Sequence, residues 1–401
     1  MRVLVVSGWY PPVMSGSSLW AQSLTLALRK RGHEVPVVTT RIPVEPPAGS
    51  RTCGRLDGAG DEAGVYRLPA WTLPRSRLLL GLANVPVAFS RANRRRILEI
   101  VGEFKPDIIH QISHIHDTLL LSAYAARRTG TPLVGSITTP IQSPSRLHHA
   151  LLAAADLAVP YHFGVRHWRR IICSDSTQAR YVRERYGRRV EGRVVTGIHA
   201  GIHQRVQQVA PEPKTPWPQI VSVGHVHPIR DPTNLIRAMP EVLGRFPDAR
   251  LDIAGRVQFQ RPVREVRRLG IEGAVRFLGE VPVEEVARLV SRAHVFAVLH
   301  QCRYAGLSFT AAEAMQFGTP VVINAPSDTY GPGVLRDGEH LVLVGGGDAA
   351  EIAAKLIALL GSPELRARIG AGGRRFVAEH LSWDLCAEKT ERLYEELLRG
   401  G

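Results

Sequence analysis

Short apolar runs alternate with longer amphipathic stretches along most of the chain, which predicts repeated strand–helix units. Residues 2–7 form an apolar run of strand length, and residues 17–31 carry apolar side chains at helical spacing. Gly32 is expected to end that helix, and 35–39 to form the next strand. A strand, a glycine-containing loop, a helix and a second strand in this order are typical of a Rossmann-type βαβ start.

The same alternation continues to the C-terminus and divides the chain. In the first half we expect further strands at 132–137 and 193–197. A proline-rich linker at 207–218 precedes a second series that opens with a strand at 220–223. The sequence therefore predicts an α/β protein with two Rossmann-like doubly wound domains, at 1–200 and 201–382, and a last helix at 383–401.

The stretch 303–322 reads as a loop, a short helix, a turn and a buried strand. Ser308 can cap the helix, while Gly318 and Pro320 end it. Backbone amides of 307–309 would lie at the helix N-terminus, which favours an anion by roughly 0.3–1 kcal/mol. Glu313 lies one turn further in, where it could accept hydrogen bonds from a ribose diol. An ordinary core helix with a solvated glutamate fits the residue types equally well.

Length and composition narrow the class of protein. At 401 residues the chain is too long for one typical core, and 44% hydrophobic with 22% charged residues is ordinary for a soluble protein. The longest apolar run, 78–89, is shorter than the roughly 18 residues that a membrane span needs. No signal-peptide pattern opens the chain, and the four cysteines lack metal or redox spacing. We therefore expect a cytoplasmic protein.

Positive charge is concentrated in the first half. Residues 1–200 hold 27 Lys and Arg against 13 Asp and Glu, whereas the rest hold 24 against 23. An excess of +14 suggests an anionic partner, such as a phospholipid surface, a phosphorylated acceptor or nucleic acid. An arginine-rich source genome would explain it as well. The run 78–89 has arginines on both sides, so it could lie at a membrane interface or pack on the sheet.

Several motifs, in order and at matching spacing, resemble those of the family-four glycosyltransferases. The segment EAMQFGTPVV contains the second acid of that family's two-glutamate motif as Glu313, but Ala305 stands where the first acid is expected. The segment PDIIH, ending at His110, resembles the family's strand that ends in histidine. In GHVHPIRDPTNLIRAM, Arg230 occupies the family's lysine position and His225 replaces an arginine.

This resemblance covers nearly the whole chain and implies the GT-B fold, two domains facing a cleft with the last helix crossing back to the first. It implies transfer of a sugar from a nucleotide-diphosphate donor, with retention of configuration and without a metal. A UDP-sugar is the expected donor and a GDP-sugar the alternative. The acceptor would be a small molecule, a lipid-linked molecule or a glycan, and nucleic acid is not expected. Peripheral contact with an anionic membrane through the basic first domain would place the protein on the inner membrane face.

The resemblance also implies roles for individual residues. Arg230, Glu313, His110 and Thr138 are the expected catalytic positions. The expected nucleotide-contacting positions are Gly16, Gly224, His225, Arg230, Gly255, Leu307, Ser308, Phe309 and Glu313. Histidines 110, 114 and 116 lie close together in sequence, but no acidic ligand set completes a metal site there.

Ala305, Thr138 and His225 depart from the family pattern and leave two interpretations open. A donor that lacks or modifies the hydroxyls usually read by the first acid would have no use for a buried carboxylate, whose isolation costs several kcal/mol. Such a donor would fit secondary metabolism or surface-polymer assembly. A catalytically impaired protein that binds nucleotide or a partner enzyme explains the same changes. A GT-B epimerase or phosphorylase is a further rival.

Overall fold

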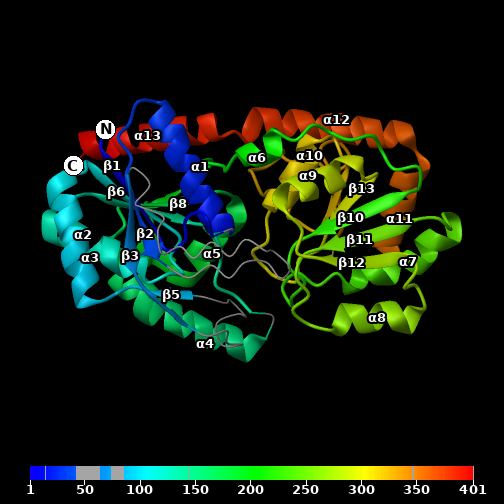
Figure 1. The fold of residues 1–401 in the computed structure, drawn as a ribbon, viewed down its shortest axis with the longest axis horizontal. Coiled ribbons are helices and arrows are strands. Elements are labelled where there is room, and N and C mark those ends of the chain that lie inside the picture. The colour runs from blue at the N-terminus through cyan, green and yellow to red at the C-terminus, as the bar shows by residue number, and fades with distance from the viewer. Residues whose placement is uncertain (14, 42–63, 74–84, 144, 346, 401) are drawn as a thin grey trace. The chain divides into compact units, whose positions relative to one another are not determined.

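The structure is a computed structural model, and it describes residues 1–13, 15–41, 64–73, 85–143, 145–345 and 347–400. The chain divides into two compact units, Met1–Ala200 with Trp383–Gly401, and Gly201–Ser382. Most of the Pro-, Gly- and Arg-rich stretch 41–64, which reads as a surface loop, and most of the apolar run 78–89 lie outside the described residues. Each unit contains its own parallel sheet with helices around it, so the predicted fold class of two Rossmann-like α/β units is confirmed (Figure 1).

The first unit contains a seven-stranded parallel sheet in the order β3-β2-β1-β6-β7-β8-β9. Its strands are β1 (Val3–Ser7), β2 (Val37–Arg41), β3 (Val65–Pro69), β6 (Ile108–Ile112), β7 (Leu133–Ile137), β8 (Arg170–Cys173) and β9 (Val194–Val195). Its helices are α1 (Gly16–Lys30), α2 (Arg91–Phe104), α3 (Thr118–Thr129), α4 (Arg146–Asp156), α5 (Ser176–Tyr186) and α13 (Trp383–Arg399). A separate antiparallel pair joins β4 (Trp71–Leu73) to β5 (Val85–Val87).

Helix α13 belongs to the first unit although it ends the chain. It lies beside α1 (Figure 1), where the Lys30 ammonium is 3.0 Å from the Asp384 carboxylate. The Lys389 ammonium donates to the Gly197 carbonyl at 2.7 Å, and the Tyr394 ring is fully buried in the core. These contacts fix the last helix against the first sheet.

The second unit contains a six-stranded parallel sheet in the order β12-β11-β10-β13-β14-β15. Its strands are β10 (Gln219–Val223), β11 (Arg250–Ala254), β12 (Val275–Gly279), β13 (Val295–Val298), β14 (Val321–Ile323) and β15 (Val342–Leu343). Its helices are α6 (Gln204–Gln207), α7 (Thr233–Arg245), α8 (Arg261–Leu269), α9 (Val283–Arg292), α10 (Phe309–Gln316), α11 (Ala349–Gly361) and α12 (Pro363–His380). One apolar core packs α7, α8 and α11 on the sheet, and another packs α9, α10 and α12.

Both sheets reverse their strand order at one point, between β1 and β6 in the first unit and between β10 and β13 in the second. In open parallel sheets, ligands bind outside the carboxyl ends of the strands at such a switch point. The loops that follow β1, β6 and β7, and those that follow β10, β11 and β13, are therefore where binding chemistry is expected.

Candidate functional site

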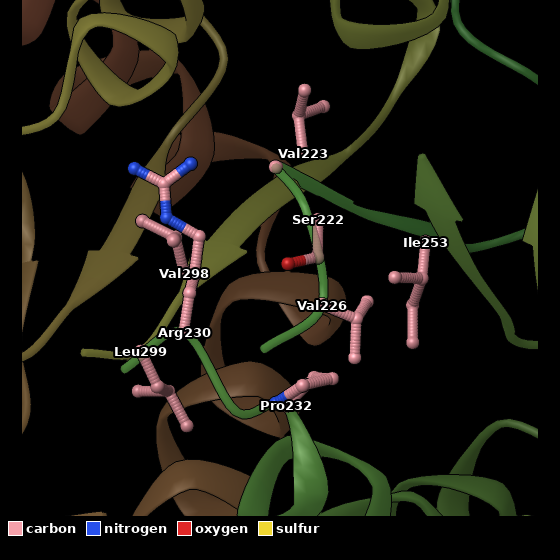
Figure 2. A pocket seen from close by; sticks show the side chains of 9 residues that line it. Ser222, Val223, Val226, Arg230, Pro232, Ile253, Val298 and Leu299 are labelled. Atoms are coloured by element: carbon pink, nitrogen blue, oxygen red, sulfur yellow. The ribbon is translucent and has the colours of Figure 1, made fainter. Parts of the chain in front are cut away.

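A small pocket lies at the carboxyl ends of β10, β11 and β13 in the second unit (Figure 2). Its walls are the last residues of these strands and the loop after β10. They comprise Ser222, Val223, Gly224, Val226, Arg230, Pro232, Ile253, Val298 and Leu299. Because most of these side chains are apolar, the Arg230 guanidinium is the charged group of the lining, and it sets the chemistry of the pocket.

The loop after β10 holds Arg230 by backbone contacts. The Arg230 amide donates to the His227 carbonyl at 2.8 Å, and the Gln301 amide donates to the Ile229 carbonyl at 2.7 Å, which ties this loop to the one after β13. Gly224 has φ +141°, and a Cβ there would lie 2.1 Å from a guanidinium nitrogen of Arg230. Glycine at this position therefore allows the arginine to fold back over the strand end.

The Arg230 side chain is half-buried, and no residue that the structure describes forms an ion pair or hydrogen bond with its guanidinium. Burial lowers the pKa of Arg230, and the neighbouring Cys302 thiol opposes this shift. An arginine nevertheless keeps its charge at physiological pH. The Arg230 guanidinium is thus a partly desolvated cation without an internal anion, and an anionic ligand would neutralise it.

Helix α10 begins beside the same strand end. The Ser308 hydroxyl caps it by accepting from the Ala311 amide at 3.3 Å. The Thr310 hydroxyl donates to the Val223 carbonyl at 3.4 Å, which joins the first turn of the helix to the end of β10. The N-terminus with Leu307, Ser308 and Phe309 therefore lies close to the pocket wall that Val223 provides. Helix N-termini bind phosphate and other anions.

Glu313 lies one turn into α10 and is half-buried. Burial raises the pKa of its carboxyl to about 8, and within the described chain no donor or cation reaches this group. At neutral pH the carboxyl is therefore mostly protonated and has unused hydrogen-bonding capacity. A ligand hydroxyl pair would satisfy it, since a carboxyl group can accept from or donate to hydroxyls.

Gly255 and His225 complete the loops around the pocket. Gly255 has φ +139°, and a Cβ there would lie 2.2 Å from the Gly224 carbonyl oxygen, so two loop backbones meet directly at this point. His225 is exposed, and its Nδ1 accepts from the Arg256 amide at 3.2 Å. The structure thus brings Gly224, His225, Arg230 and Gly255 together at the ends of β10 and β11.

Two histidines at this edge were not predicted as site residues. Burial, together with the nearby Arg230 charge, lowers the pKa of His227 to about 4 and that of His300 to about 3. The Nε2 atom of His300 is buried without a partner among the described residues. His300 follows the buried residues 295–299 at the end of β13. A polar residue after a buried apolar run is a sequence signal that could have indicated His300 as a site residue.

The first unit requires one correction. His110 was expected to contact substrate, but it is fully buried, and β6 continues two residues beyond it to Ile112. Its Nε2 lies 2.8 Å from the Ser136 hydroxyl and its Nδ1 lies 2.5 Å from the Tyr394 hydroxyl. Both ring nitrogens are therefore used inside the unit, and His110 connects β6, β7 and α13 in the core.

The carboxyl edge of the first sheet carries other polar groups. Thr138 follows β7, and its buried hydroxyl has no partner among the described residues. His116 follows β6, and its ring lies 4.3 Å from the Trp9 ring. Neither nitrogen of His116 has a described partner, and burial lowers its pKa to about 3. Gly16 is the first residue of α1. Sequence reasoning selected Gly16 and Thr138 and considered His116 only as a metal ligand.

Metal binding has no visible support in the part of the chain that the structure describes, where no three His, Cys, Asp or Glu side chains are grouped around a common point. His114, for example, has its Nε2 3.0 Å from the Tyr181 hydroxyl.

In the described helices, no segment is both long enough and apolar enough to cross a membrane.

Two family models match the chain, one within each of its two units. Residues 15–197 match the family described as Glycosyl transferase 4-like domain, and residues 204–376 match Glycosyl transferases group 1. Phosphatidyl-myo-inositol mannosyltransferase of Mycobacterium leprae is 27% identical over 405 residues, covering 100% of this chain and 98% of that protein. A GDP-mannose-dependent monoacylated alpha-(1-6)-phosphatidylinositol monomannoside mannosyltransferase of Corynebacterium glutamicum is 29% identical over 183 residues. That match covers 44% of this chain and 47% of the relative, so it spans about half the length of the Corynebacterium protein.

Solved structures show the same fold at low sequence identity. Sucrose-phosphate synthase of Thermosynechococcus elongatus superposes with a TM-score of 0.72 at 18% identity, covering 100% of both chains. Anabaena HepE, in complex with UDP and glucose, gives a TM-score of 0.71 at 15% identity and covers 98% of this chain and 99% of that one. At these identities the likenesses show the fold alone.

Proposed function

Since the chain belongs to the family-four glycosyltransferases of GT-B fold, we propose that it transfers a sugar from a nucleotide-diphosphate donor with retention of configuration and without a metal ion. Two observations support this proposal together. Arg230 is unneutralised in the pocket at the end of β10, and the unpartnered Glu313 lies one turn into α10, whose first turn contacts the same strand end. A nucleotide diphosphate has a complementary set of groups, an anion followed by a ribose diol.

Each group has a distinct role in this proposal. The Arg230 guanidinium binds the diphosphate and stabilises the negative charge that builds on the leaving oxygen while the sugar becomes oxocarbenium-like. Amides at 307–309 assist at the N-terminus of α10. Glu313 binds the ribose hydroxyls. Because a guanidinium and helix amides supply the positive field, the residues present fit a reaction without a divalent cation.

The donor base and sugar are part of the same proposal. A UDP-sugar remains the first choice, and the name of the Corynebacterium relative, which includes GDP-mannose, supports a GDP-sugar as the alternative. Ala305 is half-buried in the loop before α10 and brings neither a carboxylate nor its charge to that loop. We therefore expect a donor that does not need this acid, such as a deoxy, amino or otherwise modified sugar.

We assign the acceptor to the first unit, where the partnerless Thr138 hydroxyl and His116 ring are buried at the carboxyl edge of the sheet and are uncharged at neutral pH. The names of the two mannosyltransferase relatives describe phosphatidylinositol-based acceptors. A lipid-linked acceptor would agree with the net charge of +14 in residues 1–200. It would place the enzyme at an anionic membrane surface while it works.

Calorimetry with UDP and GDP tests the donor site. Arg230→Ala and Glu313→Ala should each weaken binding of the preferred nucleotide by at least about tenfold, as expected for the loss of a charge-assisted contact. Arg264→Ala and Glu241→Ala remove exposed charges of the same unit and should leave the affinity unchanged. Unchanged affinity in both site variants would refute the donor assignment.

A transfer assay with a panel of nucleotide sugars, in the presence of a chelator, tests the chemistry. Turnover should persist without divalent metal, and a modified sugar should be preferred over UDP-glucose. Tight nucleotide binding with no turnover of any donor would favour the catalytically impaired interpretation of Ala305. Efficient use of UDP-glucose would contradict the tailored donor site.

A further inference from the structure

Helix α4 and the helical turns that follow it expose an apolar stripe, which consists of Leu147, Leu151, Ala155, Val159 and Phe163. The four large side chains are 73%, 59%, 48% and 54% exposed, in chain order. Ala150, Ala154 and Ala158 lie next to them and are also exposed. The other exposed large apolar side chains of the described residues are scattered over α1, β4, β12, α10, α13 and a loop. Single exposed apolar residues are ordinary, but a contiguous set marks an interaction surface.

The geometry of the segment keeps the stripe in line. Residues four apart drift around an α-helix because it has 3.6 residues per turn. Residues 157–161 form a π-helical turn around Pro160, which has no amide hydrogen for the regular ladder. A π turn contains more residues than an α turn. It therefore offsets the drift and leaves Val159 and Phe163 exposed together with Leu147 and Leu151.

The opposite side of the segment is anchored to the unit. Asp156, the buried residue of α4, accepts from the Tyr181 hydroxyl at 2.8 Å and from the Tyr186 hydroxyl at 3.0 Å. The Arg185 guanidinium lies 3.3 Å from the same carboxylate and also donates to the Ile141 carbonyl at 2.8 Å. Burial raises the pKa of both tyrosines, so they remain donors at physiological pH. This network holds α4 on α5 with the stripe directed away.

Charge around the stripe is positive. Arg146 precedes it and is exposed, while His162 and Arg166 lie at its far end. Arg127 is close enough to this end to affect the pKa of His167, as Arg166 and His162 do. Between Arg146 and Ser174 the one acidic residue is Asp156, which is buried and paired. An apolar helix face with basic ends and no exposed acid matches the interface of an anionic bilayer.

We propose that this stripe inserts into the headgroup region of an anionic membrane and is the surface by which the first unit docks. The apolar side chains enter the acyl boundary, while Arg146 and Arg166 contact lipid phosphates. The docking surface belongs to α4 and the turns after it, and the proposal stands without any assumption about the donor. It rests on the proposed function only in that it would bring the enzyme to a lipid-linked acceptor.

Vesicle co-sedimentation of the full-length protein tests the proposal. The wild type should bind vesicles of equimolar phosphatidylglycerol and phosphatidylcholine and should not bind phosphatidylcholine alone. Leu147→Gln/Leu151→Gln/Phe163→Gln should reduce binding by at least about tenfold. Leu26→Gln/Leu398→Gln, which changes exposed apolar residues on α1 and α13, should leave binding unchanged. Arg146→Glu/Arg166→Glu should reduce binding most strongly at low salt, whereas Arg95→Glu on α2 should not.

Nucleotide binding, measured in parallel, separates this proposal from the donor assignment. The stripe variants should bind UDP or GDP like the wild type, so loss of vesicle binding cannot be attributed to a failed donor site. Equal binding to both vesicle types, or no binding to either, overturns the proposal. A concentration-dependent dimer that only the stripe variants abolish would also overturn it, because a second copy of the chain would then cover the stripe.

Discussion

The two units share a strand order but carry different chemistry at the edges where their strands end. The edge of the second unit presents ionisable groups without internal partners, the Arg230 guanidinium and the Glu313 carboxyl. The first unit presents neutral groups there, the Thr138 hydroxyl and the ring of His116 against Trp9. One backbone topology therefore carries ionisable groups without internal partners at one edge and neutral polar groups at the other. Ligand choice is set by the loops that follow the strands, and the sheet only positions them.

The largest expected effect comes from the glycines that shape these two edges. Gly255→Ala should destabilise the second unit by at least about 3 kcal/mol, because a Cβ at φ +139° meets the Gly224 backbone. Gly8→Ala should cost the first unit about 1–3 kcal/mol, because its Cβ would lie 2.4 Å from the His116 side chain. Urea unfolding followed by tryptophan fluorescence measures both.

A second substitution distinguishes a clash with a side chain, expected at Gly8, from a clash with the backbone, expected at Gly255. Adding His116→Gly to Gly8→Ala removes both the ring and the Cβ of residue 116, whose atoms would lie 2.4 and 2.5 Å from the new methyl group, and should restore much of the lost stability. Adding His225→Ala to Gly255→Ala should restore nothing, since the obstacle there is the backbone of Gly224. If both pairs respond alike, the claim that the second edge is built from backbone contact and the first from side-chain contact is wrong.

The next effect concerns His110, which the sequence placed in the site and the structure places in the core. His110→Ala should destabilise the first unit by about 3 kcal/mol, because it leaves a small cavity and deprives Ser136 and Tyr394 of a buried hydrogen-bond partner. Affinity for UDP or GDP should not change. Tyr394→Phe, which removes one of the two contacts, should cost less. Normal stability with lost transfer activity would return His110 to the site.

Much of the second site could be predicted because its signals are local. The capping serine, the alanine-rich turn with Glu313 and the buried run after Pro320 together predict α10 and the strand that follows. Arg230 and Glu313 lie 83 positions apart in sequence, and only their motifs suggested a common site. The contact of Thr310 with the end of β10 brings the first turn of α10 to the strand end beside which Arg230 lies.

The other features of the structure could not be predicted, because they depend on where strands end and on which side chains are buried. His110 was misplaced because β6 runs two residues past it, and sequence patterns locate strand ends poorly. His300 and His227 acquire their low pKa values from burial and from the charge of Arg230, which no local pattern encodes. The apolar stripe on α4 and the turns after it was not predicted, since leucines at helical spacing usually face a core. Only the pairing of Asp156 with Tyr181 and Tyr186 shows which side of the helix is held.

The smallest expected effect is a release of protons on nucleotide binding, which should come from Glu313 in the second unit and not from His116 in the first. With a pKa of about 8, Glu313 is about nine-tenths protonated at pH 7 in the free protein. Ribose hydroxyls that donate to the carboxylate favour its ionised form and lower its pKa, so nucleotide binding should release a proton. The diphosphate charge opposes ionisation, and release should therefore amount to a fraction of one proton. Affinity should rise with pH through neutrality and level off above about pH 8.

Calorimetry in buffers of different ionisation enthalpy, at pH values between about 7 and 8 where the nucleotide phosphates are already ionised, measures this release directly. Glu313→Gln cannot ionise, so it should bind more weakly and release no proton. His116→Gln, at the edge of the first unit, should bind and release like the wild type, because the His116 pKa of about 3 leaves it neutral throughout. Proton uptake on binding, or equal release by Glu313→Gln and the wild type, would show that Glu313 does not receive the ribose hydroxyls. The anion site would then rest on Arg230 and the N-terminus of α10 alone.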